Sequence, residues 1–193
     1  RQRQMCIRDR DCIMPREGIF AEVLTGGMIR VGDCVEVVMP QEDRPYSVAV
    51  ITLSDKAFAG ERDDLSGPAI EKILKDSEEK DHIRFDIKET ILLPDGEEGL
   101  KKQLIRLADQ RQVDLILTTG GAGCGPEDCT PEATMEVVDR PLLGIPEGMR
   151  EHMLTLTKRA MLNRAAAGIR GNVVIVNLPG KARAVKECLG YIL

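Results

Sequence analysis

The sequence predicts an α/β protein: a three-layer domain with a mostly parallel central sheet, plus a short β-rich N-terminal segment. Short, nearly continuous apolar runs alternate with amphipathic helical patterns along residues 46–193. Such runs are typical of strands buried on both faces, as in parallel sheets. Polar or glycine-rich segments directly follow four of these runs. Because ligands bind at the carboxyl ends of parallel strands, the pattern predicts a site at one edge of the sheet.

The composition limits the classes of function. The chain has 193 residues, 42% of them apolar, and a net charge of −5, which fits one full α/β domain with a small appendage. The acidic balance gives no general attraction to nucleic acid or anionic membranes, and no apolar run approaches the roughly 20 residues of a membrane helix. The six cysteines form no C-x-x-C pair, and we interpret them as reduced thiols. We therefore expect a cytoplasmic protein that binds neither nucleic acid nor membrane.

The first 45 residues differ in character from the rest. Residues 1–12 contain four arginines without apolar periodicity, and we interpret them as a disordered or non-native leader, not as a basic nucleic-acid arm. Residues 13–39 contain short strand-like runs with too little apolar surface for a core of their own. Residues 40–45 are polar, contain two prolines, and are predicted to be a linker to the domain at 46–193.

The first half of the domain contains two predicted strand–helix pairs. Residues 46–53 are β-branched and apolar and predict a buried strand. Gly67-Pro68 places a proline in the first turn of a helix whose apolar residues keep helical spacing up to a charged stretch at 76–81. Residues 85–93 predict a second strand, and apolar residues between 100 and 108 mark the helix after it.

The second half continues the alternation. Residues 113–118 predict a third strand, which runs into a glycine-rich segment at 119–126. Thr130-Pro131 is read as an N-cap followed by proline at the first helical position. Residues 146–168 have a helical composition, and residues 172–177 predict a fourth buried strand. The apolar stripe of a last helix consists of Ala184, Val185, Cys188 and Leu189.

The four polar segments after the strands are expected to meet at one edge of the sheet. The glycine run contains neither G-K-[ST] nor G-x-G-x-x-G, so by itself it is either a flexible connection or a nest of backbone amides for phosphate. Asp95 and Asp128 could be turn or cap residues, and Asp55 and Asp64 solvated loop residues. Beside a phosphate site, carboxylates become reasonable when Mg²⁺ offsets their repulsion. We expect most of the nearby cations to be solvated and one or two to line this edge: Arg150, Arg164, Arg170 and Lys181.

Two segments resemble known families. Residues 14–33, MPREGIFAEVLTGGMIRVGD, resemble the C-terminal end of a MOSC domain, a β-rich module linked to molybdenum-cofactor sulfur chemistry. We carry over no activity from this short match. From about Tyr46 to Leu193 the chain resembles the MogA/MoaB family of molybdopterin adenylyltransferases and their relatives. The matching segments, in the family's order, are ITLSD (51–55), LLPDG (92–96), TTGGAGCGPEDCTPEAT (118–134), PEGMR (146–150), AAAGIRG (165–171) and NLPG (177–180).

The second resemblance implies a reaction and a set of residues. The terminal phosphate of molybdopterin would attack the α-phosphate of ATP, giving adenylylated molybdopterin and pyrophosphate. Asp95 and Asp128 match the family's two critical aspartates and would coordinate Mg²⁺ or position phosphate. A homotrimer and a partner enzyme that inserts molybdenum are also implied. The implied binding residues are Gly120, Gly121 and Gly123 in the pterin-phosphate loop, Ser54, Asp55 and Asp64 on the nucleotide side, and Thr119, Thr130, Glu147, Asn163, Asn177, Pro179 and Gly180 along the same edge.

The chain departs from the family's pattern at three positions. Ala122 stands where the glycine loop usually has threonine, Glu127 where a basic residue often precedes the loop aspartate, and Asn163 where serine is common. Losing one hydrogen bond to phosphate would cost about 1–3 kcal/mol, enough to weaken turnover without abolishing it. The departures leave open an alternative, a non-catalytic molybdopterin-binding or carrier module of the same fold.

Overall fold

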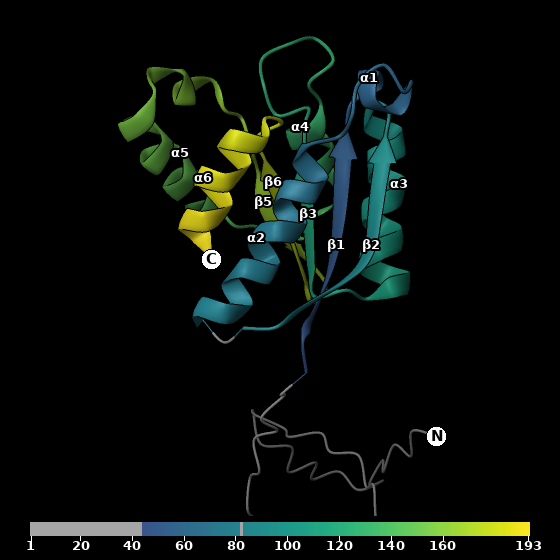
Figure 1. Ribbon diagram of the computed structural model, residues 1–193. Helices are drawn as coiled ribbons and strands as arrows, with labels where there is room; N and C mark the ends of the chain where they lie inside the picture. The colour runs from purple at the N-terminus through teal and green to yellow at the C-terminus, as the bar shows by residue number, and fades with distance from the viewer. Residues whose placement is uncertain (1–43, 82) are drawn as a thin grey trace, which may run out of the picture. The chain divides into compact units, whose positions relative to one another are not determined.

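A computed structural model describes residues 44–81 and 83–193. The leader, the MOSC-like segment and residues 40–43 of the linker lie outside the described residues, so the expectations for them stay predictions. The described part is an α/β domain with one six-stranded sheet between two layers of helices, as predicted (Figure 1). None of its helices has the length and hydropathy needed to cross a bilayer.

The strands of the sheet are β1 (Tyr46–Leu53), β2 (Phe85–Leu93), β3 (Leu115–Thr119), β4 (Arg140–Pro141), β5 (Ala167–Arg170) and β6 (Val173–Leu178). β1 pairs in parallel with β2 on one side and β3 on the other, and β3 pairs in parallel with β6. Beyond β6, β5 and β4 extend the sheet with antiparallel pairing. The strand order is β2-β1-β3-β6-β5-β4, so the four parallel strands end at the same edge.

The helices are α1 (Asp55–Phe58), α2 (Ser66–Asp81), α3 (Glu97–Ile105), α4 (Thr130–Val137), α5 (Gly144–Leu156) and α6 (Ala182–Ile192). α3 continues as a π-helical segment, Arg106–Arg111, and a 3₁₀ turn, Lys158–Leu162, follows α5. α2, α5 and α6 contribute to one apolar cluster, and α3 and α4 to a second. The two clusters lie on opposite faces of the sheet, because successive residues of β1 alternate between them.

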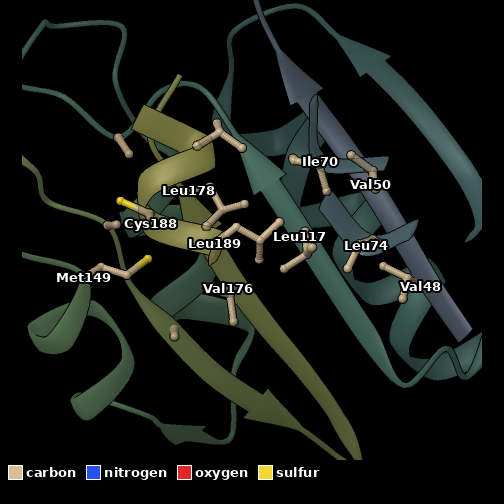
Figure 2. Close-up of a cluster of buried hydrophobic side chains, with 14 residues drawn as sticks. Val48, Val50, Ile70, Leu74, Leu117, Met149, Val176, Leu178, Cys188 and Leu189 are labelled. Carbon is tan, nitrogen blue, oxygen red and sulfur yellow. The ribbon is translucent and has the colours of Figure 1, made fainter. Parts of the chain in front are cut away.

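The first cluster shows why β1 reads as a continuous apolar run. Val48 and Val50 pack against Ile70 and Leu74 of α2 (Figure 2). The intervening Ala49 belongs to the second cluster, as do Ile51 and Leu53 further along β1. Full burial of an aliphatic side chain of this size contributes about 1.5–3 kcal/mol, so both faces of β1 stabilise the sheet.

One sequence prediction about local structure is wrong, and a second is confirmed only in part. Thr130 is the first residue of α4 and not its cap, because its hydroxyl donates to Gly120 O (2.9 Å). The segment 146–168, which has a helical composition, contains most of α5 and the 3₁₀ turn, but α5 ends at Leu156 and Ala167 already belongs to β5. The antiparallel strands β4 and β5 are therefore elements that the sequence reading missed.

Candidate functional site

The loops after β1, β2, β3 and β6 meet at the carboxyl edge of the parallel strands, as the sequence predicts (Figure 1). A cavity of about 170 Å³ lies among them, and we call it the polar cavity. The helices α2 and α4 both begin at this edge, where their N-terminal amides favour negative charge. The polar cavity is lined by Thr52, Leu53, Ser54, Ala57, Arg62, Asp64, Ser66, Asp95, Thr119, Gly120, Gly121, Asp128 and Gly180.

Asp55 and Asp95 hold the loops after β1 and β2 together. The backbone N–H of Asp55 donates to Asp95 Oδ2 (3.1 Å), and the N–H of Asp95 donates to Asp55 Oδ1 (2.9 Å). Ser54 fixes the same turn, because its hydroxyl oxygen accepts from the N–H of Ala57 (3.3 Å) and caps α1. Asp55 does not line the cavity, so the structure gives it the task of positioning the Asp95 carboxylate.

The Asp95 carboxylate lies in an environment that opposes its charge. Burial raises the pKa of Asp95 above its ordinary value, and the negative charges of Asp55 and Asp128 raise it further. The hydrogen bond from the Asp55 amide acts in the opposite direction but does not cancel these effects. A cation placed between Asp95 and Asp128 would relieve the repulsion.

The glycine run after β3 lets the backbone pack against its neighbours. Gly120 and Gly121 have φ values of +100° and +60°, and a Cβ on Gly120 would lie 2.2 Å from Leu53 O. A side chain on Gly121 would collide with Thr130 Oγ1 at 2.4 Å. Side chains are therefore excluded at the point where this loop crosses the end of β1.

The Asp128 carboxylate is held by its own loop. Asp128 Oδ2 accepts from the N–H of Gly125 (2.7 Å), and the Asp128 N–H donates to Gly125 O (3.1 Å). Arg164 fastens the outside of the loop: its Nε donates to Gly123 O and its Nη2 to Asp128 O, both at 2.5 Å. It also forms an ion pair with Glu132. Of the four cations considered for this edge, Arg164 is thus engaged in setting the loop's position.

A larger cavity, about 580 Å³, adjoins the polar cavity at Gly180, which lines both. Its wall combines apolar side chains with three cations, Arg159, Lys181 and Arg183. Within the described part of the chain, these cations form no ion pair. Its lining consists of Ala122, Gly123, Met153, Leu156, Thr157, Arg159, Ala160, Leu162, Asn163, Pro179, Gly180, Lys181, Arg183, Ala184 and Glu187.

Besides Asp55, three predicted binding residues line neither cavity. Asn177 is fully buried, and its Nδ2 donates to the hydroxyls of Thr118 (2.9 Å) and Thr134 (2.8 Å). Thr130 is equally buried and donates its hydroxyl to the glycine loop. Both residues thus hold the carboxyl edge of the sheet in place through buried hydrogen bonds, and neither faces a cavity. Glu147 is exposed in the first turn of α5, whereas only the C-terminal end of that helix reaches the larger cavity.

Three polar or charged residues of the polar cavity were not predicted from the sequence: Thr52, Arg62 and Ser66. Ser66 donates its hydroxyl to Gly180 O (3.0 Å) and joins α2 to the loop after β6. Thr52 stands inside a buried strand, where a threonine is ordinary, and Arg62 stands in a polar loop. Their residue types gave no local signal, because only the folded chain brings them together.

Comparison with known proteins agrees with this geometry. Residues 49–193 match the family described as "Probable molybdopterin binding domain". The chain therefore belongs to this molybdopterin-binding family. Two relatives named molybdopterin adenylyltransferase come from Helicobacter pylori strain J99 (39% identity, covering 74% of this chain and 78% of the relative) and Escherichia coli K12 (36%, 74% and 71%). The crystal structure of the molybdopterin biosynthesis enzyme MoaB from Thermus thermophilus superposes with a TM-score of 0.70 at 41% identity, covering 76% of this chain and 89% of the other.

The side chains of the polar cavity can be compared with the ligands that Mg²⁺ usually binds in proteins. Mg²⁺ in proteins usually binds one or two carboxylates and completes its shell with substrate phosphates and water. The polar cavity offers the carboxylates of Asp95 and Asp128. Among residues 44–81 and 83–193, no three His, Cys, Asp or Glu side chains form a group that could hold a metal by themselves. The chemistry of these donors fits an ion whose shell is completed by phosphate.

Proposed function

We propose that this protein transfers the adenylyl group of ATP to molybdopterin and releases pyrophosphate, as a step of molybdenum cofactor biosynthesis. One observation carries the proposal: a small cavity with two positioned carboxylates opens beside a larger cavity at the carboxyl edge of the sheet. The relatives named molybdopterin adenylyltransferase support the same chemistry.

The sizes of the cavities favour a division of the substrates between them. Sites for small organic molecules commonly have volumes of about 300–1,000 Å³. The larger cavity, at about 580 Å³, falls in that range, whereas the polar cavity, at about 170 Å³, has room for phosphate groups but not for a whole nucleotide. We infer that the reacting phosphates meet in the polar cavity. A ring system of a substrate then occupies the larger cavity.

The transfer needs alignment and charge neutralisation more than covalent help from the protein. Asp95 and Asp128 would hold Mg²⁺, which when bound would neutralise the charge of the phosphates. Asp55 would keep Asp95 in place through their paired hydrogen bonds. The backbone of Gly120, Gly121 and Gly123 would face the phosphate of molybdopterin. Ser54 and Asp64 would border the nucleotide, and Asn163, Pro179 and Gly180 the boundary between the two cavities.

We also infer a cytoplasmic homotrimer that passes its product to an enzyme inserting molybdenum. Exposed apolar side chains near the 3₁₀ turn support self-association, because a soluble monomer rarely gathers such groups on its surface. Of these side chains, Leu154 and Met161 line neither cavity. Sedimentation equilibrium of the full chain tests the trimer, and a monomer at all concentrations would contradict it.

A direct assay tests the proposed reaction. Purified protein is mixed with ATP, Mg²⁺ and molybdopterin, and pyrophosphate and adenylylated pterin are measured. We expect both products, their loss on chelation of Mg²⁺, and a loss of at least about 100-fold in Asp128→Asn. Asp76→Asn is the matched control, since it removes an exposed carboxylate that lines neither cavity. Binding of molybdopterin without any pyrophosphate would support the carrier alternative instead.

A further inference from the structure

Arg62 is the single cationic side chain among the described residues that line the polar cavity. It lies in the loop between α1 and α2. The backbone of this loop is anchored, because the N–H groups of Glu61 (2.9 Å) and Arg62 (3.3 Å) both donate to Lys56 O. The Arg62 side chain is exposed and makes no ion pair or hydrogen bond within the described part of the chain. A fixed backbone thus presents an uncommitted guanidinium to a cavity that also contains three aspartates.

Thr52 supplies a second uncommitted group to the same cavity. Its side chain is only 4% exposed, yet Thr52 Oγ1 has no hydrogen-bond partner. No other buried side-chain N or O atom in the described residues lacks a partner. The start of α2 approaches this hydroxyl closely, and only glycine fits at residue 67: a Cβ there would lie 3.0 Å from Thr52 Oγ1 and 2.6 Å from Asp64 Oδ2. Since an unpartnered buried hydroxyl is costly, its position indicates a ligand atom that completes its hydrogen bonding.

We propose that Arg62 and Thr52 bind the β- and γ-phosphates of ATP and stabilise pyrophosphate as it leaves. This inference rests on the proposed adenylyl transfer. When an oxygen of the molybdopterin phosphate bonds to the α-phosphorus, the bond from that phosphorus to the α–β bridging oxygen breaks. The electron pair of the broken bond stays on pyrophosphate, whose negative charge therefore rises. Arg62 is the protein cation placed to offset that charge.

The residue type and its exposure fit this role. A guanidinium presents a planar pair of N–H donors, which matches two phosphate oxygens at once. The other charged side chains lining the polar cavity are the carboxylates of Asp64, Asp95 and Asp128, which repel pyrophosphate unless a cation intervenes. Because Arg62 is exposed, it can contact the leaving group on the solvent side while Thr52 contacts the buried end.

Binding of inorganic pyrophosphate with Mg²⁺, measured by calorimetry on the full chain, tests the inference without molybdopterin. We expect Arg62→Gln to weaken pyrophosphate binding at least about tenfold. Arg62→Lys should restore part of the lost affinity, since lysine keeps the positive charge but not the planar pair of N–H donors. AMP binding should be unchanged in both, because AMP has no β- or γ-phosphate. Thr52→Val should weaken pyrophosphate binding several-fold without lowering the melting temperature, since it removes an unpartnered hydroxyl and preserves shape.

Arg111→Gln is the matched control, because Arg111 pairs with Glu89 (3.0 Å) and lines neither cavity. Unchanged pyrophosphate affinity in Arg62→Gln would overturn the inference, as would an equal loss of AMP binding. In the turnover assay, Arg62→Gln should reduce kcat/KM for ATP by about 100-fold. If wild-type protein binds pyrophosphate through Arg62 but never forms adenylylated pterin, the proposed reaction fails and the pyrophosphate site stands.

Discussion

The two ends of the parallel sheet each contain a half-buried aspartate, and the two residues are treated in opposite ways. Asp114 precedes β3 at the amino end, where Arg44 donates to both of its oxygens (2.8 and 2.9 Å) and Ser47 donates through N–H and hydroxyl (2.7 Å each). These bonds hold the pKa of Asp114 well below its usual range. Asp95 follows β2 at the carboxyl end, where burial and two neighbouring carboxylates raise its pKa. The carboxylate charge of Asp114 is thus compensated by its hydrogen-bond donors, whereas the carboxylate charge of Asp95 is not.

The difference indicates where the fold is optimised for stability and where for ligands. At the amino end, the Asp114 N–H donates back to Ser47 (2.9 Å to its carbonyl), so that charge and backbone are both paired. At the carboxyl end, Thr52 has a buried hydroxyl without a partner and Arg62 a side chain without one, within the described residues. Groups that a protein leaves unpaired at a strand end are those available to a substrate.

The largest effect expected from this comparison is on turnover in Asp95→Asn. The asparagine oxygen can still accept the hydrogen bond from the Asp55 amide, so the loops should keep their positions. The negative charge that would hold Mg²⁺ is lost, and we expect kcat to fall at least about 100-fold. Pyrophosphate release measures the effect, with circular dichroism as the check on folding. Turnover near that of wild type would show that the uncompensated charge at this end is not used.

The amino end should show the reverse behaviour, a loss of stability without a loss of turnover. Asp114→Ala removes the acceptor for Arg44 and Ser47, and we expect the free energy of unfolding to fall by about 2–3 kcal/mol. We expect no larger loss of unfolding free energy, because the Arg44 side chain is 52% exposed and solvent screens its attraction to Asp114. Urea denaturation measures the change, and kcat per folded molecule should be unaltered.

Asp86→Ala is the matched control for the amino-end prediction. Asp86 forms an ion pair with Lys88 on the exposed side of β2, and both side chains are largely in solvent. Such a surface pair contributes less than about 1 kcal/mol, so its removal should change stability little. An equal loss of unfolding free energy in Asp86→Ala and Asp114→Ala would mean that the hydrogen bonds of Asp114 stabilise the fold no more than an exposed ion pair does.

The sequence was informative where burial is continuous along the chain. β1 and β2 have the predicted bounds, because an apolar run buried on both faces is visible without knowing its neighbours. β5 was missed, since it contains alanine and glycine and is formed through antiparallel pairing with β6. Its hydrogen bonds come from the backbone of a partner strand, and Ile169 is the only residue in it with a high β-propensity.

The sequence predicted the parts of the site that directly follow a strand. Asp95, Asp128 and the glycine run were found because they follow strands directly, and the parallel topology brings them together. The tasks of Arg164 and Asn177 could not be found this way. Arg164 reaches Asp128 O from 36 residues further along the chain, and Asn177 reaches the Thr134 hydroxyl from 43 residues further. Such contacts depend on the packing of the whole sheet, not on any local pattern.

The smallest expected effect concerns pH, and its sign differs between the two ends. The folded-state pKa of Asp95 is raised, so ionisation costs stability as pH rises from the unfolded value of 3.8 through the folded value. Asp95→Asn should therefore be more stable than wild type at pH 7, with the difference vanishing toward pH 4. The folded-state pKa of Asp114 is lowered, so its contribution is complete above 3.8 and is lost as pH falls below it. Urea titrations of the wild type and both variants from about pH 2 to pH 7 measure both slopes, because this range extends below and above the unfolded aspartate pKa of 3.8. A wild type more stable at pH 7 than Asp95→Asn would mean that the Asp95 charge is compensated, and the contrast between the two ends would fail.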